Sequence, residues 1–114
     1  GIAIVTEILG TAVLLWGVLA SGDAKNMALG ANLGGLFVAL TVLAVGLCLG
    51  GPSGYAINPA RDLGPRIFGL LVGTKGLFDG LYWLLAPVVA TIIGGVLGAY
   101  TYDWFVTPNL PAGE

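Results

Sequence analysis

"GYAINPARDLGPRIF" (residues 54–68) is the stretch of sequence that decides the fold. It places three charged side chains, those of Arg61, Asp62 and Arg66, between two long hydrophobic segments. The chain of 114 residues is 57% hydrophobic and only 9% charged, and its mean hydropathy is +0.97. A soluble domain carries about 25% charged residues. The composition therefore predicts an integral membrane protein, in which this charged stretch needs an explanation.

The charged and reactive residues argue against several classes of function. The net charge is −2 and no basic run is present, so we expect no nucleic-acid partner. Histidine is absent and Cys48 is the single cysteine, which argues against a zinc site, a disulfide framework and a Cys/His catalytic pair. We expect no catalytic residues, no metal and no cofactor. Cys48 lies in an apolar run, and we expect it to be a small buried side chain.

Three apolar stretches are long enough to cross a membrane. They cover residues 2–20, 27–49 and 80–105, and the first is interrupted only by Glu7. At about 1.5 Å per residue, each reaches across a hydrocarbon core of about 30 Å. Lipid favours helices, because exposed backbone groups find no water there. The sequence therefore predicts an all-α membrane protein with three transmembrane helices and a C-terminal tail at residues 107–114.

Residues 50–72 break this pattern. Their opening "GGPSG" does not suit a helix interior, because glycine is costly there and proline lacks an N–H donor. Asn58 and Pro59 then suit the N-cap and the first helical position, and we predict a helix from Pro59 to about Leu71. About 13 residues give roughly 20 Å, which is too short to span a bilayer. A re-entrant half-helix fits, with residues 51–57 facing a pore; an interfacial helix after a surface loop is the alternative.

The sequence resembles a known family at several places. "NPAR" (residues 58–61) is the signature of the aquaporin and glycerol-facilitator family, the major intrinsic proteins. "TEILGT" (residues 6–11) resembles the start of that family's fourth helix, "GYAINPARDLGPR" (residues 54–66) its second pore loop, and "WLLAPV" (residues 83–88) the start of its sixth helix. The chain therefore resembles the C-terminal repeat of an aquaglyceroporin.

The resemblance implies one aquaporin-like repeat over residues 1–106, with three transmembrane helices plus one re-entrant half-helix. Members of the family have two such repeats of opposite orientation, each with an Asn-Pro-Ala motif, whereas this chain has one. Either the chain is a fragment or a separate chain supplies a complementary N-terminal half-repeat, because one repeat cannot enclose the pore. The implied setting is a plasma or inner membrane, in which complete protomers form a homotetramer within the lipid bilayer.

The resemblance also assigns roles within the pore loop. Asn58, Pro59 and Ala60 form the Asn-Pro-Ala motif, and the Asn58 amide contacts passing solute. The N-terminus of the half-helix carries roughly +0.5 charge, which repels cations and protons. Arg61 belongs to the selectivity filter and donates to solute oxygens. Backbone carbonyls line one wall of the pore, those of Gly54, Tyr55, Ala56 and Ile57.

Three charged residues have implied supporting roles. A carboxylate inside a span costs about 2.5–3.5 kcal/mol on insertion scales unless it is paired. The resemblance implies that Glu7 accepts hydrogen bonds from backbone N–H groups of the pore loop; a solvated Glu near a helix end is the alternative. Asp62 and Arg66 are spaced to pair along the half-helix, and we favour this structural role over solute contact.

Three places bear on the choice of solute. Water-selective members of the family have His at the filter position that Gly46 occupies here, and its absence implies a wider filter. Tyr55 stands where water channels often have a small residue, and its ring can pack on the carbons of a polyol. Asp62, Arg66 and Pro87-Val88 resemble glycerol facilitators. The implied function is passive passage of glycerol or a small polyol, with water; a channel that prefers water, ammonia or urea, and a non-conducting membrane subunit, are the alternatives.

Overall fold

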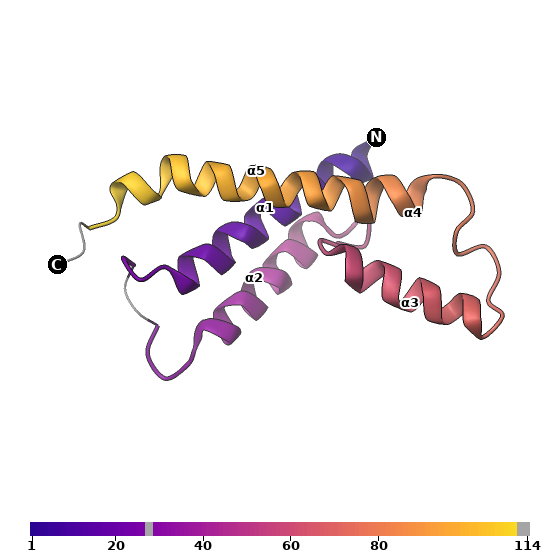
Figure 1. Cartoon of the computed structure of the whole chain (residues 1–114), viewed down its shortest axis with the longest axis horizontal. Coiled ribbons are helices and arrows are strands. Elements are labelled where there is room, and N and C mark those ends of the chain that lie inside the picture. Colours follow the sequence, from indigo (N-terminus) through magenta and orange to yellow (C-terminus); the bar gives the residue numbers. More distant parts are fainter. Residues whose placement is uncertain (27–28, 112–114) are drawn as a thin grey trace.

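The computed structural model describes residues 1–26 and 29–111 of the chain. Over these residues the chain is helical and contains no strand. The elements are α1 (Ile2–Gly22), α2 (Gly34–Leu49), α3 (Pro59–Leu71), α4 (Tyr82–Leu84), the π-helical turn η1 (Leu85–Ala90), α5 (Thr91–Phe105) and the short 3₁₀ helix η2 (Thr107–Asn109). Because α4, η1 and α5 follow one another without a break, we call them together the C-terminal helix (Figure 1).

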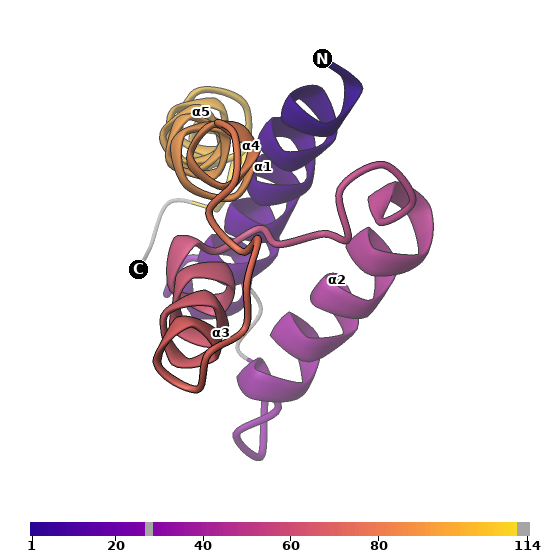
Figure 2. The same cartoon turned by 90° about the vertical axis from the view of Figure 1, so that its right-hand side faces the viewer.

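Helix α1 is the central element of the fold. It packs most extensively against α5 and also against α2 and η1. The C-terminal helix runs in the same direction as α1, whereas α2 returns in the opposite direction (Figure 1). Helix α3 starts near the middle of the molecule and points away from the other helices (Figure 1). It stands apart from α2, and we call the side on which the two helices are separated the open side of the fold (Figure 2). The arrangement thus places the start of α3 where α1, α2 and η1 come together.

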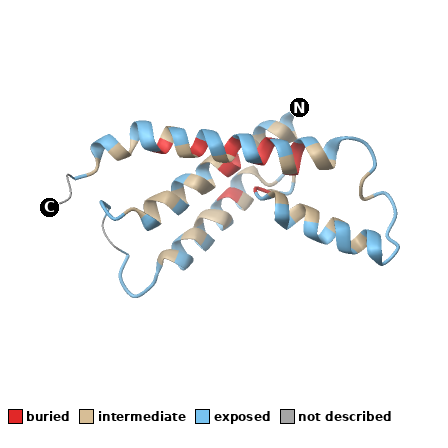
Figure 3. Cartoon of the chain, viewed as in Figure 1, coloured by how far each residue is buried: buried red, intermediate tan, exposed pale blue. Residues whose placement is uncertain are grey.

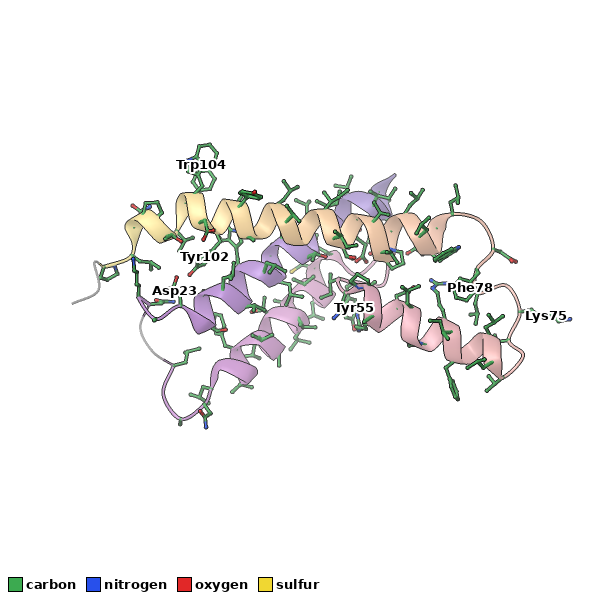
Figure 4. All side chains as sticks on the ribbon, viewed as in Figure 1. Asp23, Tyr55, Lys75, Phe78, Tyr102 and Trp104 are labelled. Carbon is green, nitrogen blue, oxygen red and sulfur yellow. The ribbon has the colours of Figure 1, made fainter. Side chains whose placement is uncertain are left out.

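Close approach of α1 and α5 depends on small residues. A Cβ built on Gly98 would lie 2.8 Å from both the Cα and the O of Ala12, so the two backbones touch where these residues meet. Small residues at such spacing let apolar helices approach within van der Waals contact. The far end of the pair is tied by the Tyr102 hydroxyl, which donates to Asp23 Oδ2 at 3.0 Å (Figure 4). These contacts make α1 and α5 the most closely packed pair of helices in the fold.

Helix α2 is shorter than the sequence predicted. The expected helix covered residues 27–49, but the helix begins at Gly34; Met27 and Ala28 lie outside the described residues. Ala31 and Asn32 have φ values of 53° and 57°, a left-handed conformation that ends helical geometry. The 16 residues of α2 reach about 24 Å, less than a hydrocarbon core of about 30 Å. Hydropathy alone did not reveal this turn.

Two helical stretches are long and apolar enough to cross a membrane by length and composition. They are Ile2–Gly22 and Tyr82–Asn109, and both lie close to the predicted spans at residues 2–20 and 80–105. The second stretch contains η1, where the helix widens around Pro87. Proline lacks the N–H of a regular helical bond. The Thr91 hydroxyl donates to the carbonyl of Pro87 at 2.7 Å.

Few residues of the chain are buried, and they lie where the helices meet. Figure 3 shows the buried positions along the C-terminal helix, along α1, on α2 and in the loop just before α3. Large hydrophobic side chains elsewhere are exposed, among them Leu36, Phe37, Leu40, Leu43 and Leu47 on α2 and Ile67, Phe68, Leu70 and Leu71 on α3. Cys48, which we expected to be buried, is exposed, because α1 covers only one side of α2. Lipid or further protein would cover this apolar surface.

Candidate functional site

Helix α3 begins at Pro59 with Asn58 as its N-cap, as the sequence predicted. Asn58 has extended backbone angles (φ −160°, ψ 120°), and its Oδ1 accepts from the N–H of Ala60 at 2.9 Å and, more weakly, from that of Arg61 at 3.4 Å. Pro59 occupies the first helical position, where a missing N–H costs nothing. Asn58 and Arg61 are both exposed on the open side of the chain. The positive end of the helix is therefore accessible to a polar molecule.

The backbone before α3 is strained. Gly54 has φ 77°, and the next positive values belong to Tyr55 at 43° and Ile57 at 44°. Left-handed geometry is unfavourable for a residue with a side chain, particularly a β-branched one such as Ile57, and costs of order 1–3 kcal/mol per residue. Such a conformation persists only where the surroundings hold it. Two sets of contacts, one from α1 and one from Arg61, do so here.

The first set comes from Glu7 on α1. The N–H of Ala56 donates to Glu7 Oε1 at 2.8 Å, and the N–H of Ile57 donates to Oε2 at 2.7 Å. Glu7 is only 1% exposed, so it is not solvated, contrary to the alternative considered from the sequence. Hydrogen bonds to an ionised group are roughly twice as strong as neutral ones, which offsets the cost of burying the carboxylate. Glu7 thus holds the loop before α3 by its backbone.

The second set comes from Arg61. Its Nη1 donates to the carbonyl oxygen of Tyr55 and, at 3.4 Å, to that of Ala56. The guanidinium carbon also lies 4.7 Å from the centre of the Tyr55 ring, a cation–π contact. Figure 4 shows Tyr55 at the junction between α2 and α3. These contacts gather a cation, two carbonyls and an aromatic ring in one place.

Gly46 on α2 completes this group. A Cβ built on Gly46 would lie 3.1–3.3 Å from Cζ, Cε2 and Cε1 of Tyr55. The sequence interpretation took the missing side chain at position 46 as added width in the filter. In this structure the Tyr55 ring takes up that space. Gly46 therefore accommodates the ring, and the two residues determine the local shape together.

Two open hollows lie beside this group of residues. One, of about 330 Å³, is mostly apolar and is lined by Ala39, Val42, Leu43, Gly46, Leu47 and Tyr55. The other, of about 390 Å³, contains the charged residues and is lined by Ser53, Gly54, Ala56, Arg61, Asp62 and Pro65. Tyr55 lines the first hollow, and the residues on either side of it in the chain, Gly54 and Ala56, line the second. A small molecule here would meet an apolar wall and a polar one.

Asp62 and Arg66 pair one turn apart on α3. Arg66 donates to Asp62 through Nε and, at 3.2 Å, through Nη2. Arg66 Nη1 also donates to the carbonyl oxygen of Leu77 in the loop that follows α3. The sequence suggested the pair but not this third bond, because Leu77 carries no polar side chain. Arg66 therefore ties the half-helix to the loop that leads into the C-terminal helix.

Sequence reasoning also missed several residues around the loop. The Tyr82 hydroxyl donates to the Ser53 carbonyl at 3.1 Å, which ties the start of the C-terminal helix to the pore loop. Gly10 and Thr11 are buried on α1 beside Glu7, and the Thr11 hydroxyl donates to the Glu7 carbonyl at 2.7 Å. Residues spaced three and four apart share one face of a helix. That spacing from Glu7 is the signal that could have found Gly10 and Thr11.

Comparison with known proteins decides the family. The family model described as "Major intrinsic protein" matches residues 1–102. The chain belongs to the major intrinsic protein family. It is 48% identical over 105 residues to the "Probable glycerol uptake facilitator protein" of Thermotoga maritima, a match that covers 91% of this chain and 44% of the relative. This similarity agrees with the aquaglyceroporin resemblance of the sequence motifs.

Other members of the major intrinsic protein family show the same relationship. The chain is 42% identical over 102 residues to "Glycerol uptake facilitator protein 3" of Lactiplantibacillus plantarum, covering 87% of this chain and 40% of the relative. It is 38% identical over 109 residues to "Aquaporin-10" of Homo sapiens, covering 94% of this chain and 36% of the relative. The chain thus spans less than half the length of these curated relatives.

Proposed function

We propose that this major intrinsic protein chain forms one half of a passive channel for glycerol and other small neutral solutes, with water. The names of two relatives describe glycerol uptake facilitators, and that of a third describes an aquaporin. No catalysis and no cofactor belong to this proposal. Solute moves down its own gradient, and the chain contributes shape and electrostatics.

The observation that carries the proposal is the grouping of Arg61 with Tyr55. The guanidinium carbon lies 4.7 Å from the centre of the ring, and Nη1 contacts the Tyr55 and Ala56 carbonyls. Glycerol has hydroxyl groups along one edge and C–H groups along the other. Guanidinium donors and carbonyl acceptors suit the hydroxyls, and an aromatic ring suits the carbons. This pairing of surfaces matches a polyol better than it matches water alone.

Positive charge near Asn58 supports the exclusion of ions. The start of α3 carries roughly +0.5 charge. Arg61 adds a full positive charge three residues later. Both would face a cation or a proton that entered the pore, and electrostatic barriers of this kind exclude such ions in water channels. Neutral solutes meet no such barrier.

The proposed position in the membrane follows the helices. Helix α1 and the C-terminal helix would cross the bilayer of a plasma or inner membrane. Helix α2, which is too short to cross alone, would do so together with the residues that precede it, and α3 would enter the bilayer without crossing. This arrangement makes residues 1–106 the half-repeat, with a tail at residues 107–114, of which 112–114 lie outside the described residues. Strained backbone at membrane depth is tolerated where it lines a wet cavity. The loop before α3 is where this condition applies.

A complementary half-repeat is the proposed partner. Asn58 and Arg61 are exposed, and exposed apolar side chains lie on α2 and α3. These two helices stand apart from each other (Figure 2). A second repeat seated there would close the pore and cover the apolar surface. Complete protomers would then assemble into a homotetramer, each with its own pore.

Substitution of Arg61 tests this assignment in the assembled channel. Arg61→Ala removes the fixed charge and the donors that face the pore, so we expect a loss of discrimination between glycerol and larger polyols, together with a new cation conductance. Arg61→Lys keeps the charge without the planar fork and should keep cations out while it lowers glycerol flux. Flux and conductance in planar bilayers and liposomes measure both. Unchanged selectivity in Arg61→Ala would remove Arg61 from the filter.

A further inference from the structure

We propose that Gly10 and the side chain of Ile57 form the contact that fixes the direction of the pore-loop carbonyls, which makes both of them positioning residues for solute selection. The role in selection rests on the proposed channel function. The contact itself does not, because it is visible in the packing of this chain. Gly10 and the Ile57 side chain are buried away from the solute in this proposal, and both act on solute selection only through the backbone of the loop.

Gly10 provides a slot between α1 and α2. A Cβ built on Gly10 would lie 3.1 Å from Ile57 Cγ2 and 3.0 Å from Val45 Cγ1. Real Cβ contacts are rarely this short, so a side chain at position 10 would displace its neighbours. Ile57 is 4% exposed and Val45 is 3% exposed, so both are packed deeply. The Ile57 side chain is therefore packed closely against Gly10, and a side chain at position 10 would require Ile57 or Val45 to shift.

The slot at Gly10 and the carboxylate of Glu7 both lie on α1 and both contact the loop before α3. Gly10 lies three residues after Glu7, so both lie on one face of α1. Glu7 holds the N–H groups of Ala56 and Ile57, and the slot holds the side chain of Ile57. Together they keep Ile57 at φ 44°, a conformation that a β-branched residue avoids. The loop is thereby fixed at two points.

Because a peptide unit is planar, fixing its N–H group also fixes the direction of its carbonyl group on the other side of the loop. In a trans peptide the N–H and the preceding C=O point in opposite directions, and no described peptide bond is cis. With the Ala56 and Ile57 N–H groups turned toward Glu7, the Tyr55 and Ala56 carbonyls turn away from α1. Both of these carbonyls accept from Arg61. A shift of Ile57 would therefore move the carbonyl wall and Arg61 together.

Gly17 offers a matched control on the same helix. A Cβ on Gly17 would lie 2.6 Å from Thr41 Oγ1 and 2.8 Å from its Cγ2, so Gly17→Ala disturbs the packing of α1 on α2 at least as strongly as Gly10→Ala does. Thr41 is on α2, and Gly17 lies about two turns of α1 beyond Gly10. A general packing effect would appear in both variants. A positioning effect would appear only in Gly10→Ala.

The first readout is the ratio of glycerol to water permeability in the channel assembled from this chain and its complementary half. We expect Gly10→Ala to lower the ratio by about threefold or more, and Gly17→Ala to leave it nearly unchanged. Ile57→Ala tests the contact from the loop side, should Gly10→Ala fail to assemble, and Ile92→Ala on the exposed face of α5 is its control. Equal changes in the Gly10 and Gly17 variants would overturn the inference.

The second readout is amide hydrogen exchange at Ala56 and Ile57 in the same assembly, which needs no conduction. Gly10→Ala should speed exchange at both amides, because the loop moves away from Glu7, whereas Gly17→Ala should not. If the unsubstituted assembly carries no glycerol, the channel proposal fails, yet exchange still decides whether Gly10 positions the loop. Faster exchange with an unchanged permeability ratio would overturn the role in selection, and unchanged exchange would overturn the positioning role.

Discussion

The ring of Tyr55 lies against Gly46, so closely that a Cβ on residue 46 would be 3.1 Å from Tyr55 Cζ. One residue is on α2 and the other follows it by nine positions, on the loop before α3. Their volumes are therefore coupled, because a larger residue at 46 requires a displaced or smaller residue at 55. The width of the candidate filter at this point is therefore set by Gly46 and Tyr55 together.

Substitution of Gly46 should affect glycerol more than water. In Gly46→His the imidazole occupies the place of the Tyr55 ring and forces the ring toward Arg61. A narrower passage excludes the larger solute first. We expect glycerol permeability to fall by about tenfold and water permeability by much less. Stopped-flow light scattering on liposomes that hold the assembled channel measures both.

Two further variants control this result. Gly46→His combined with Tyr55→Ala removes the collision, and water permeability should recover. Gly35→His tests histidine elsewhere on α2, where a Cβ would meet no neighbouring element within 4 Å among the described residues, and it should change neither permeability. Equal loss of glycerol and water permeability in Gly46→His would contradict the assignment of Gly46 to the filter.

Glu7→Gln should loosen the pore loop without a large change in global stability. Glutamine has one acceptor oxygen in place of two, so one of the Ala56 and Ile57 N–H groups stays buried without a partner, at a cost of about 1–3 kcal/mol. Removal of the carboxylate charge from the interior opposes this loss, because a charge inside a span is costly to insert. The melting temperature is therefore a poor readout. Lower glycerol permeability and faster amide exchange at one of the two residues are the expected results.

Asp103→Asn is the matched control for Glu7→Gln, because Asp103 is an exposed carboxylate at the far end of the C-terminal helix. Glycerol permeability and loop exchange should stay at the unsubstituted level in this variant. Protection of both loop amides in Glu7→Gln would show that the carboxylate does not hold the loop.

Arg66→Gln should release the loop between α3 and the C-terminal helix. The substitution removes the bond to the Leu77 carbonyl and the pair with Asp62. Lys75 lies in this loop, far from the helix bundle (Figure 4), so a lysine-specific protease reports its opening. Loss of about 1 kcal/mol of local stability should raise the cleavage rate after Lys75 about fivefold. Asp62→Asn keeps the Leu77 bond and should raise the rate less; equal cleavage of all three proteins would contradict the tie.

Local chemistry explains which parts of the fold could be read from the sequence. Asn58 and Pro59 predicted the start of α3 correctly, because helix capping depends on residues that are neighbours in the sequence. The helix also ends at Leu71, as expected. The start of α2 could not be read in the same way, because the left-handed turn at Ala31 and Asn32 lies in a stretch whose hydropathy resembles a span. Cys48 was misjudged for a related reason, since an apolar side chain in such a fold can face outward.

The features of the site that could not be predicted from the sequence are contacts between residues far apart in the chain. The bonds from Ala56 and Ile57 to Glu7 join residues about fifty positions apart, and the family resemblance suggested them where spacing could not. The contact of Tyr55 with Gly46 and the slot at Gly10 depend on how closely backbones approach. Neither distance is encoded in residue type alone, so only the structure supplies them.

Glycerol flux into liposomes tests the central claim most directly. The chain would be reconstituted alone and together with the complementary half-repeat of a close relative, and glycerol entry would be followed by stopped-flow light scattering. The account predicts rapid glycerol entry with both halves and entry no faster than in protein-free liposomes with the chain alone. Assembly of both halves, verified by co-purification, with glycerol entry no faster than in protein-free liposomes would contradict it.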